Sequence, residues 1–304
     1  MENPPMAYRL LGNETTGEFL KRVASEQVAK AIEDLEGADD DLHEAVHEFR
    51  KRCKKIRGLI RLVRPDFPDY AAENAWFRDL AGELSALRDA TSMQESVAAL
   101  MEHYADDLDE DAYAGIDAWL GKRRETMTEE RDAREKIDLI RAELPEALAR
   151  IEGWRLDSGG ADALEAGLAK TYKRARRAMA SAADDGTSRD FHEWRKRVKY
   201  HRYHLRLLTP IWPKVTKARY KETKRLSDLL GDDHDLAVLR ATLEEEAGGA
   251  ADERAALIAL SRRRSAELRA QAWSLGRRLF VEEQERYAAR MRALIEIRNE
   301  ECPR

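Results

Sequence analysis

Apolar side chains recur every three or four residues along most of the 304-residue chain, which is the spacing of one face of an α-helix. Glycine and proline number only 16 and 8, and they gather between the periodic stretches, where such residues end helices. No alternating run of β-branched residues has the length of a strand. The pattern therefore predicts an all-α protein of about eight to ten helices.

These signals also place the helical segments and one boundary. The segments cover residues 16–35, 42–63, 74–101, 112–151, 164–183, 191–208, 214–246 and 252–298, with an interruption near Pro145 and a break at Gly248 and Gly249. The acidic stretch at residues 36–41 is expected to be a loop, the one at residues 103–111 a loop or the start of a helix, and both are expected to face solvent. Residues 154–162, which include Gly159 and Gly160, are the best boundary. It divides the chain into residues 1–155 and 156–304.

The second half repeats the pattern of the first. Residues 46–65 read VHEFRKRCKKIRGLIRLVRP and residues 191–210 read FHEWRKRVKYHRYHLRLLTP, with ten of 20 positions identical. Unrelated helices would share roughly one or two positions. A shorter block at residues 84–89 corresponds to residues 230–235 after a shift of one residue. Two copies of one helical unit predict two antiparallel bundles related by an approximate two-fold axis.

A stripe of basic residues runs along the repeated helix. In the first copy it contains His47, Arg50, Lys54, Arg57 and Arg61, and in the second copy His192, Arg195, Lys199, Arg202 and Arg206. At this spacing each set occupies about 80° of the helix surface. Its centre lies only about 100° from the apolar face that begins with Val46 and Phe49. The basic stripe is therefore expected beside the core, along a groove between the two bundles.

Charge is the least ordinary part of the composition. Asp, Glu, Lys and Arg make up 37% of the chain, yet 54 basic and 59 acidic residues leave a net charge of only −5. Residues 47–64 hold eight basic side chains and one glutamate, and residues 192–209 hold six and one. Like charges at helical spacing repel by a few tenths of a kcal/mol per pair. The repeated helix therefore needs a compensating anion, either a protein carboxylate or a ligand.

Other residues near the stripes are candidates for the same surface. They are Lys51 and Lys196 inside the repeat, Tyr172, Lys173 and Arg176 before its second copy, and Lys217, Lys221 and Lys224 after it. The competing interpretation is that the stripes are solvated faces paired with nearby carboxylates such as Glu48 and Glu193. Two observations favour a ligand: the stripe recurs at the same positions in both copies, and four of the seven histidines lie in the two repeated blocks, residues 46–65 and 191–210.

The motif His-Glu-x-Arg-Lys-Arg-x-Lys-x-x-Arg, at residues 47–57 and 192–202, resembles that of the conserved histidine α-helical domain, or CHAD, family. Residues 172–177 and 229–236 are also similar to that family's second half, and the resemblance extends over residues 17–297. It departs at Ser85, where the second copy has Gly231. No attached triphosphate-tunnel domain is visible, so a stand-alone copy is expected.

The resemblance implies two bundles with pseudo-two-fold symmetry around a basic groove or pore that binds inorganic polyphosphate. Matched by motif, the binding residues would be His47, Arg50, Lys51, Lys54, Arg57, Arg61, His192, Arg195, Lys196, Lys199, Arg202 and Arg206. Binding without turnover is expected, with no cofactor and no metal, because no Walker loop, carboxylate pair or metal-ligand cluster is visible. Polyphosphate granules and polyphosphate-metabolising enzymes are the further partners that this function suggests.

Two other functions would use the same residues. Single-stranded RNA also binds basic surfaces, but aromatic residues make up only 7% of the chain, the pI is about 5.9, and no base-stacking module is recognisable. Nucleic acid is therefore the less favoured ligand. A metal-assisted enzyme that acts on phosphate chains would use histidines as ligands. The candidates are His201 and His204, and His234, whose neighbours in the sequence are Asp232, Asp233 and Asp235.

The sequence also limits where the protein works. No uncharged apolar run approaches the ~18 residues of a membrane span, and the first 20 residues do not resemble a signal peptide. Cys53 and Cys302 are too few for a disulfide framework. A cytoplasmic protein that does not enter a membrane is expected.

Overall fold

The computed structural model describes residues 8–12, 14–107, 113–127, 130–184, 186–245 and 250–301. The all-α prediction is confirmed, because this part of the chain consists of helices joined by short loops and contains no strand. The first half holds α1 (Thr16–Glu36), α2 (Leu42–Leu62), α3 (Tyr70–Gly82), α4 (Ser85–His103), α5 (Ala114–Met127) and α6 (Glu130–Gly153). The second half holds α7 (Gly160–Asp184), α8 (Ser188–Leu207), α9 (Pro213–Glu245), α10 (Ala251–Leu279) and α11 (Gln284–Glu301). Short 3-10 turns occupy Gly37–Asp39, Ala105–Asp107 and Thr209–Ile211.

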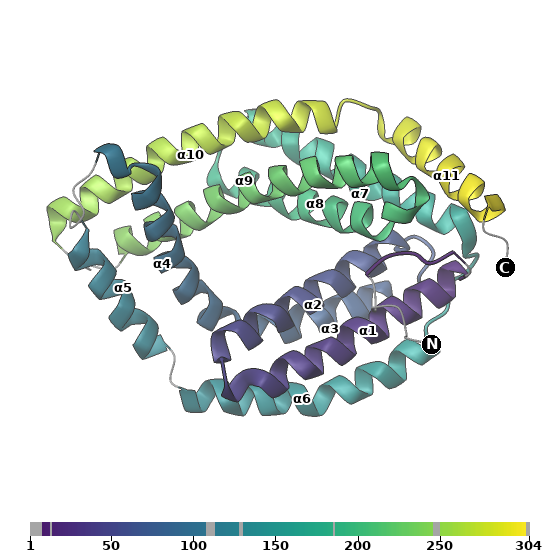
Figure 1. The fold of residues 1–304 in the computed structure, drawn as a ribbon, viewed down its shortest axis with the longest axis horizontal. Coiled ribbons are helices and arrows are strands. Elements are labelled where there is room, and N and C mark those ends of the chain that lie inside the picture. The colour runs from purple at the N-terminus through teal and green to yellow at the C-terminus, as the bar shows by residue number, and fades with distance from the viewer. Residues whose placement is uncertain are drawn as a thin grey trace.

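Helices pack in a similar order in the two halves (Figure 1). In the first half α1 packs against α2 and α6, and α2 packs against α3. In the second half α7 packs against α8 and α11, and α8 packs against α9. In addition, α2 packs against both α7 and α8. The halves therefore meet along the two helices that carry the basic stripes.

Side-chain caps explain where the first helix and both basic helices begin. Thr15 accepts a hydrogen bond from the Glu18 backbone N–H, and the Glu18 carboxylate accepts one from the Thr15 backbone N–H, which forms a capping box. Asp41 and Thr187 accept hydrogen bonds from first-turn N–H groups of α2 and α8, at 3.0 and 3.2 Å. Each cap satisfies an N–H that has no partner within the helix, so the starts of α2 and α8 are fixed locally.

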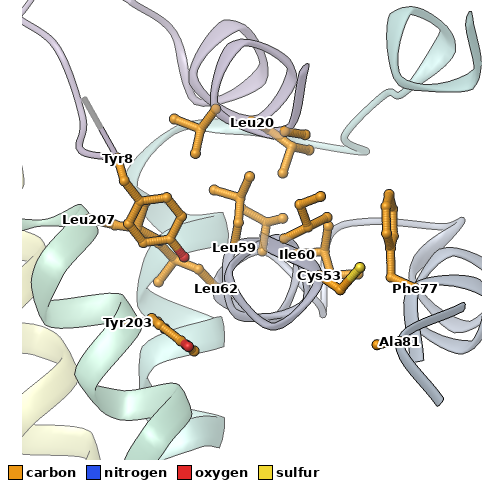
Figure 2. Close-up of a cluster of buried hydrophobic side chains, with 14 of the residues drawn as sticks. Tyr8, Leu20, Cys53, Leu59, Ile60, Leu62, Phe77, Ala81, Tyr203 and Leu207 are labelled. Carbon is orange, nitrogen blue, oxygen red and sulfur yellow. The ribbon is translucent and has the colours of Figure 1, made fainter. Parts of the chain in front are cut away.

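α2 lies at the centre of the larger hydrophobic core (Figure 2). Its Leu59, Ile60 and Leu62 are wholly buried. The side chains around them come from three other helices: Leu20 from α1, Phe77 and Ala81 from α3, and Tyr203 and Leu207 from α8. Burying one such aliphatic side chain contributes about 1.5–3 kcal/mol. This apolar face holds α2 in place and leaves the basic stripe at the edge of the core.

Glycines allow the two halves to approach closely at α2. A Cβ at Gly58 would lie 2.9 Å from the Tyr203 side chain of α8, and a Cβ at Gly167 of α7 would lie 1.7 Å from the Leu62 carbonyl oxygen. A polar contact crosses the same interface, because His204 Nε2 lies 3.0 Å from the Gly58 carbonyl oxygen. Helix backbones this close have no room for a side chain at the point of contact.

A second, smaller core joins helices from different halves. It contains Met93, Val97 and Leu100 of α4, Ile116 and Leu120 of α5, Leu236, Leu239 and Leu243 of α9, and Leu257 and Leu268 of α10. In Figure 1, α4 and α5 extend away from α1 and α2 to reach α10. The boundary between residues 155 and 156 therefore separates two sequence halves that share both cores.

The predicted segment 112–151 is divided between α5 and α6, and two other long segments are interrupted where the sequence predicts continuous helix. Residues 74–101 are divided between α3 and α4, because α3 ends at Gly82 and α4 begins at Ser85. The break turns α4 toward α9, against which it packs. Residues 252–298 are divided between α10 and α11, and Phe280 is buried at that break. These two errors have one cause. When the helices before and after a break both need apolar residues for packing, the helical periodicity of the sequence continues through the break.

The opposite error concerns Pro145, where an interruption was expected and α6 is continuous. Pro145 itself is exposed, whereas Leu144 and Ala147 beside it are buried. The carbonyl group left unpaired by the proline can therefore be hydrated, while the buried face holds the helix together. The expected break at Gly248 and Gly249 lies outside the described residues, as does the end of the second acidic stretch.

One carboxylate fastens the linker between the halves. Asp66 accepts hydrogen bonds from the backbone N–H of Ser158 at 3.0 Å, from the Ser158 hydroxyl, and from the backbone N–H of Gly159 at 2.7 Å. Burial alone would raise the pKa of Asp66, but these hydrogen bonds outweigh it and hold the pKa below its ordinary value. Gly159 and Gly160 have φ of +69° and +70°, which only glycine adopts at little cost.

We expect Asp66→Ala to lower the free energy of unfolding by about 2 kcal/mol, because three donors lose their acceptor at a buried site. Asp66→Asn should cost less, since its amide oxygen still accepts. The matched control is Asp69→Ala, because Asp69 is exposed and makes no capping hydrogen bond to α3. Urea denaturation at pH 7 measures all three variants, and equal losses at the two positions would contradict the prediction.

Residues from near both described ends of the chain lie beside this linker. Leu10, residues 154–156 and 158–161, Ile295 and Asn299 all line a cavity of about 660 Å³. The Leu10 backbone N–H donates to the Leu207 carbonyl at 2.8 Å, which ties the N-terminal segment to α8. The segment before α1, the linker and the end of α11 are therefore close together in space.

Candidate functional site

α2, α8 and α9 surround a pocket of about 580 Å³ at the interface between the halves. Its lining residues are His47, Lys51, Lys54 and Lys55 of α2, Lys199, Arg202, Tyr203 and Arg206 of α8, Tyr220, Lys224 and Asp228 of α9, and Tyr8. α8 packs against both of the other helices, which brings these positions together. Both copies of the basic stripe thus contribute side chains to one pocket.

The pocket is strongly cationic. Seven of its lining residues are lysine or arginine, against the single carboxylate of Asp228. That carboxylate lies 2.6 Å from Lys224 Nζ and 3.5 Å from Arg202 Nη1, so it compensates two cations at the α9 side. The other cationic lining residues come from both α2 and α8.

Two pocket lysines show the effect of this crowding. Burial and the charges of Lys54 and Arg195 lower the pKa of Lys199 well below its ordinary value. Burial and the charges of Arg52 and Lys51 lower the pKa of Lys55 to about 8. A negative charge within a few ångströms favours the charged form of an ammonium group. A bound anion would therefore remove the repulsion that now acts on both side chains.

The solvated-face interpretation holds for two of the predicted lysines. Lys51 forms an ion pair with Glu48, and Lys196 forms the equivalent pair with Glu193 in the second copy. His47 lies 3.9 Å from Glu48 and its side chain is 41% exposed. Exposed pairs of this kind contribute little to stability, so they leave Lys51 and His47 accessible at the rim of the pocket.

Three stripe arginines point away from the pocket lining. Arg50 Nη1 donates to the Ala81 carbonyl of α3 at 2.6 Å. Arg57 Nε donates to Asn74 Oδ1 at 3.3 Å. The Arg61 guanidinium lies 4.0 Å from the centre of the Tyr200 ring, and burial lowers its pKa to about 10. These residues join α2 to α3 and α8. They add positive electrostatic potential near the pocket but do not line it.

The start of the second stripe forms a separate group. His192 Nδ1 and His234 Nδ1 of α9 lie 3.0 Å apart. Burial and the charges of Lys196 and Arg195 lower the pKa of His192. Burial, the charge of Arg195 and the neighbouring His192 lower the pKa of His234 to about 3. Arg195 stands beside this pair and within electrostatic reach of Lys199. The pair is therefore neutral at pH 7, with one nitrogen donating to the other.

The residues proposed from outside the repeat have different positions. Tyr172 is fully buried, stacks on Tyr287 with ring centres 4.2 Å apart, and donates to the Leu279 carbonyl. Arg176 is ion-paired with Glu283, and Lys173 lies on the same helix outside the pocket lining. Tyr172 and Arg176 hold α7 against the end of α10 and the start of α11. Lys224 lines the pocket, whereas Lys217 and Lys221 are exposed on α9 beyond it.

Several lining residues are not indicated by the basic stripe in the sequence. Lys55 lies one position beyond the stripe, and only the excess of charge in residues 47–64 indicated it. Tyr8, Tyr203 and Tyr220 gave no signal, because nothing in their spacing relates them to α2. Tyr203 is buried against Gly58, and Tyr8 donates to the Lys55 carbonyl at 2.8 Å. Such residues become recognisable only when the packing of α2 against α8 is known.

The histidines considered for metal binding occupy buried or paired positions. His201 and His204 are fully buried, and Asp233 beside His234 is paired with Arg269 at 2.9 Å. Within the described residues, no three His, Cys, Asp or Glu side chains converge as metal ligands would. None of the helices in that same part of the chain has the length and apolar character needed to cross a bilayer.

The fold and site define an all-helical protein whose two halves meet around a cation-lined pocket. The model of the CHAD domain family matches residues 22–244, and the chain belongs to this family. The resemblance inferred from the repeated motif is thereby confirmed.

Solved structures agree with this assignment at the level of the fold. PptA from Streptomyces chartreusis is 14% identical, with a TM-score of 0.61 over 88% of this chain and 100% of its own. The CHAD domain from the plant Ricinus communis is 19% identical, with a TM-score of 0.58 over 97% of both chains. No curated protein matches the chain by sequence.

Proposed function

We propose that the protein binds inorganic polyphosphate in the pocket between α2, α8 and α9, without hydrolysing it. The observation that carries the proposal is the charge of this pocket, in which seven cationic side chains are opposed by one carboxylate. Polyphosphate carries negative charge on every unit and has no bases to be read. It is a narrow, flexible chain that fits a pocket with many cations and few other recognition groups.

The lining side chains supply complementary kinds of contact. Arg202 and Arg206 can each grip two phosphate oxygens with a planar guanidinium fork, whereas Lys54 and Lys199 act as mobile point charges. His47 at the rim can donate a hydrogen bond, and an adjacent phosphate would raise its pKa. Several simultaneous contacts would release counterions, so affinity should fall steeply with salt.

The side chains favour binding over turnover. Phosphoryl transfer needs a group that positions or deprotonates a nucleophile, usually together with a bound cation. Asp228 is the carboxylate among the lining residues, and it already pairs with Lys224 and Arg202. Its oxygens are occupied by these ion pairs, which argues against its use to position or activate a water molecule.

Calorimetry with long-chain polyphosphate at fixed salt tests the proposal. We expect Lys54→Gln/Lys199→Gln to weaken binding about 100-fold, because two charge-assisted contacts are lost. The variant should be at least as stable as the wild type, since repulsion at Lys199 is relieved. The control Arg277→Gln/Arg278→Gln removes the same charge from exposed positions on α10 and should bind like the wild type. If the pocket variant bound polyphosphate as tightly as the control variant, the assignment of the site would be wrong.

Two further measurements separate the competing functions. Single-stranded RNA, added at equal phosphate concentration and equal salt, should not displace bound polyphosphate; displacement would favour a nucleic-acid-binding protein. Phosphate release from polyphosphate with Mg²⁺ should remain at background, and release that His47→Ala abolishes would favour an enzyme. Polyphosphate granules in the cytoplasm and polyphosphate-metabolising enzymes are the partners through which a binding protein of this kind would act.

A further inference from the structure

The face of α9 that lines the pocket continues beyond it as a row of lysines. Tyr220, Lys224 and Asp228 are the lining residues of α9. Lys214, Lys217 and Lys221, called here the α9 track, precede them in the same helix. With 3.6 residues per turn, all six positions fall within an arc of about 120°. The pocket and the α9 track therefore form one continuous surface.

The α9 track is exposed and carries uncompensated charge. Its three lysines are all exposed, and none of them forms an ion pair within the described part of the chain. Arg219 lies outside the arc and turns the other way, donating to the Leu279 carbonyl at 2.7 Å and lying 3.4 Å from Glu282. The helix thus places its paired arginine against α10 and leaves the unpaired lysines in solvent.

The position of the α9 track in the helix also favours an anion. Lys214 and Lys217 lie in the first turns of α9, where unpaired backbone N–H groups already create positive potential. Acidic side chains are the usual residues at such an end, and the first turn of α9 has none. Lys214 and Lys217 at this end add repulsion that a bound polyanion would remove.

The corresponding helix of the first half offers no such surface. The helix that follows α2 is α3, whose sequence YAAENAWFRDLAG contains no lysine and includes Glu73 and Asp79. Asp79 is paired with its neighbour Arg78. The repeated basic stripes contribute to the pocket from both halves, but the row of exposed lysines continues along α9 and has no equivalent along α3.

We infer that the α9 track binds the part of a polyphosphate chain that extends out of the pocket, so that the protein selects long chains over short ones. This inference rests on the proposed function. A volume of about 580 Å³ is that of a small-molecule site, so the pocket holds only a short stretch of polymer. From Lys214 to Lys224 the helix rises about 15 Å. Contacts to a second stretch of the same chain raise affinity by effective concentration.

Calorimetry with two ligands at matched salt tests this selection: tripolyphosphate, which can occupy the pocket alone, and a chain of roughly one hundred units. The test variant is Lys214→Gln/Lys217→Gln/Lys221→Gln. The control Lys170→Gln/Arg277→Gln/Arg278→Gln removes the same charge from exposed positions on α7 and α10. The pocket variant Lys54→Gln/Lys199→Gln is measured alongside.

We expect the track variant to bind the long chain about tenfold more weakly and tripolyphosphate within about twofold of the wild type. Its long-chain affinity should also depend less steeply on salt, because fewer counterions are released. The pocket variant should lose affinity for both ligands, and the control should lose neither.

Other outcomes identify which idea fails. Long-chain binding by the track variant that equals the wild type, or an equal loss for both ligands, would overturn the inference while the pocket stands. Loss for both ligands in the control would do the same, because it would show a general charge effect. Absence of polyphosphate binding by the wild type would overturn the proposed function itself.

Discussion

Gly167→Ala is expected to lower the free energy of unfolding by about 3 kcal/mol or more, which exceeds the effect of most single substitutions. The new Cβ would lie 1.7 Å from the carbonyl oxygen of Leu62 and 3.1 Å from that of Arg61. Both neighbours are backbone atoms of α2, so neither can rotate away as a side chain would. α7 and α2 must therefore separate, and the packing between the halves is lost with them.

Urea denaturation followed by circular dichroism measures this effect. Gly153→Ala is the matched control, because Gly153 ends α6 and an added Cβ there meets nothing within 4 Å. It should change stability by less than about 1 kcal/mol. If Gly167→Ala were as stable as Gly153→Ala, the close approach of α7 to α2 would be wrong. A variant that fails to fold would agree with the prediction, provided that the control folds.

Acid should destabilise the protein strongly between pH 6.5 and 4, largely because of its buried histidines. Burial lowers the pKa of His204 to about 3, with the nearby charges of Arg61 and Arg64 acting in the same direction. Burial also lowers the pKa of His201 well below its ordinary value. The folded protein thus binds fewer protons than the unfolded chain below pH 6.5. Stability is fully present above that pH and is lost as the pH falls toward 3.

The expected size follows from about 1.4 kcal/mol per pH unit for each such group. His204 alone should therefore account for a loss of about 3 kcal/mol between pH 6.5 and 4. His204→Leu tests this, because Leu59 occupies the equivalent position in the first copy and leucine does not titrate. Carboxylates contribute equally in both proteins, so the difference between their urea-derived stabilities at pH 7 and pH 4 isolates the histidine. Parallel pH profiles would contradict the assignment.

The fold was predictable where periodicity and end signals agree. Both exist for α2 and α8, whose caps and apolar faces are local properties of the sequence. The breaks between α3 and α4 and between α10 and α11 were missed, because they are imposed by what the next helix packs against. At Pro145 a break was expected and the helix continues, because the effect of a proline depends on whether the carbonyl group that it leaves unpaired can reach water. The direction of the next helix and the access of a carbonyl group to water depend on tertiary structure, and helical periodicity does not report either of them.

The pocket was predictable to the extent that it is built from one repeated helix. Lys54, Lys199 and Arg206 follow from a stripe beside an apolar face, because side chains at that angle must lie near the neighbouring helix. Arg50 was expected in the same set, yet it donates to a carbonyl of α3. Tyr172 was included because of the basic residues that follow it, but its ring belongs to the core. Local charge indicates a surface, whereas the choice of partner for each side chain depends on the helices that surround it.

The cavity beside the linker has a consequence for the topology of the chain. Leu10 before α1, Gly159 in the linker and Asn299 near the end of α11 line the same cavity. The polypeptide is therefore almost a closed loop, whose described ends return to the point where its halves are joined. Packing between α2, α7 and α8 and the second core hold those halves together, and neither depends on which half comes first. The same architecture is compatible with a circularly permuted chain that opens at the linker and connects the segment around Leu10 to the end of α11.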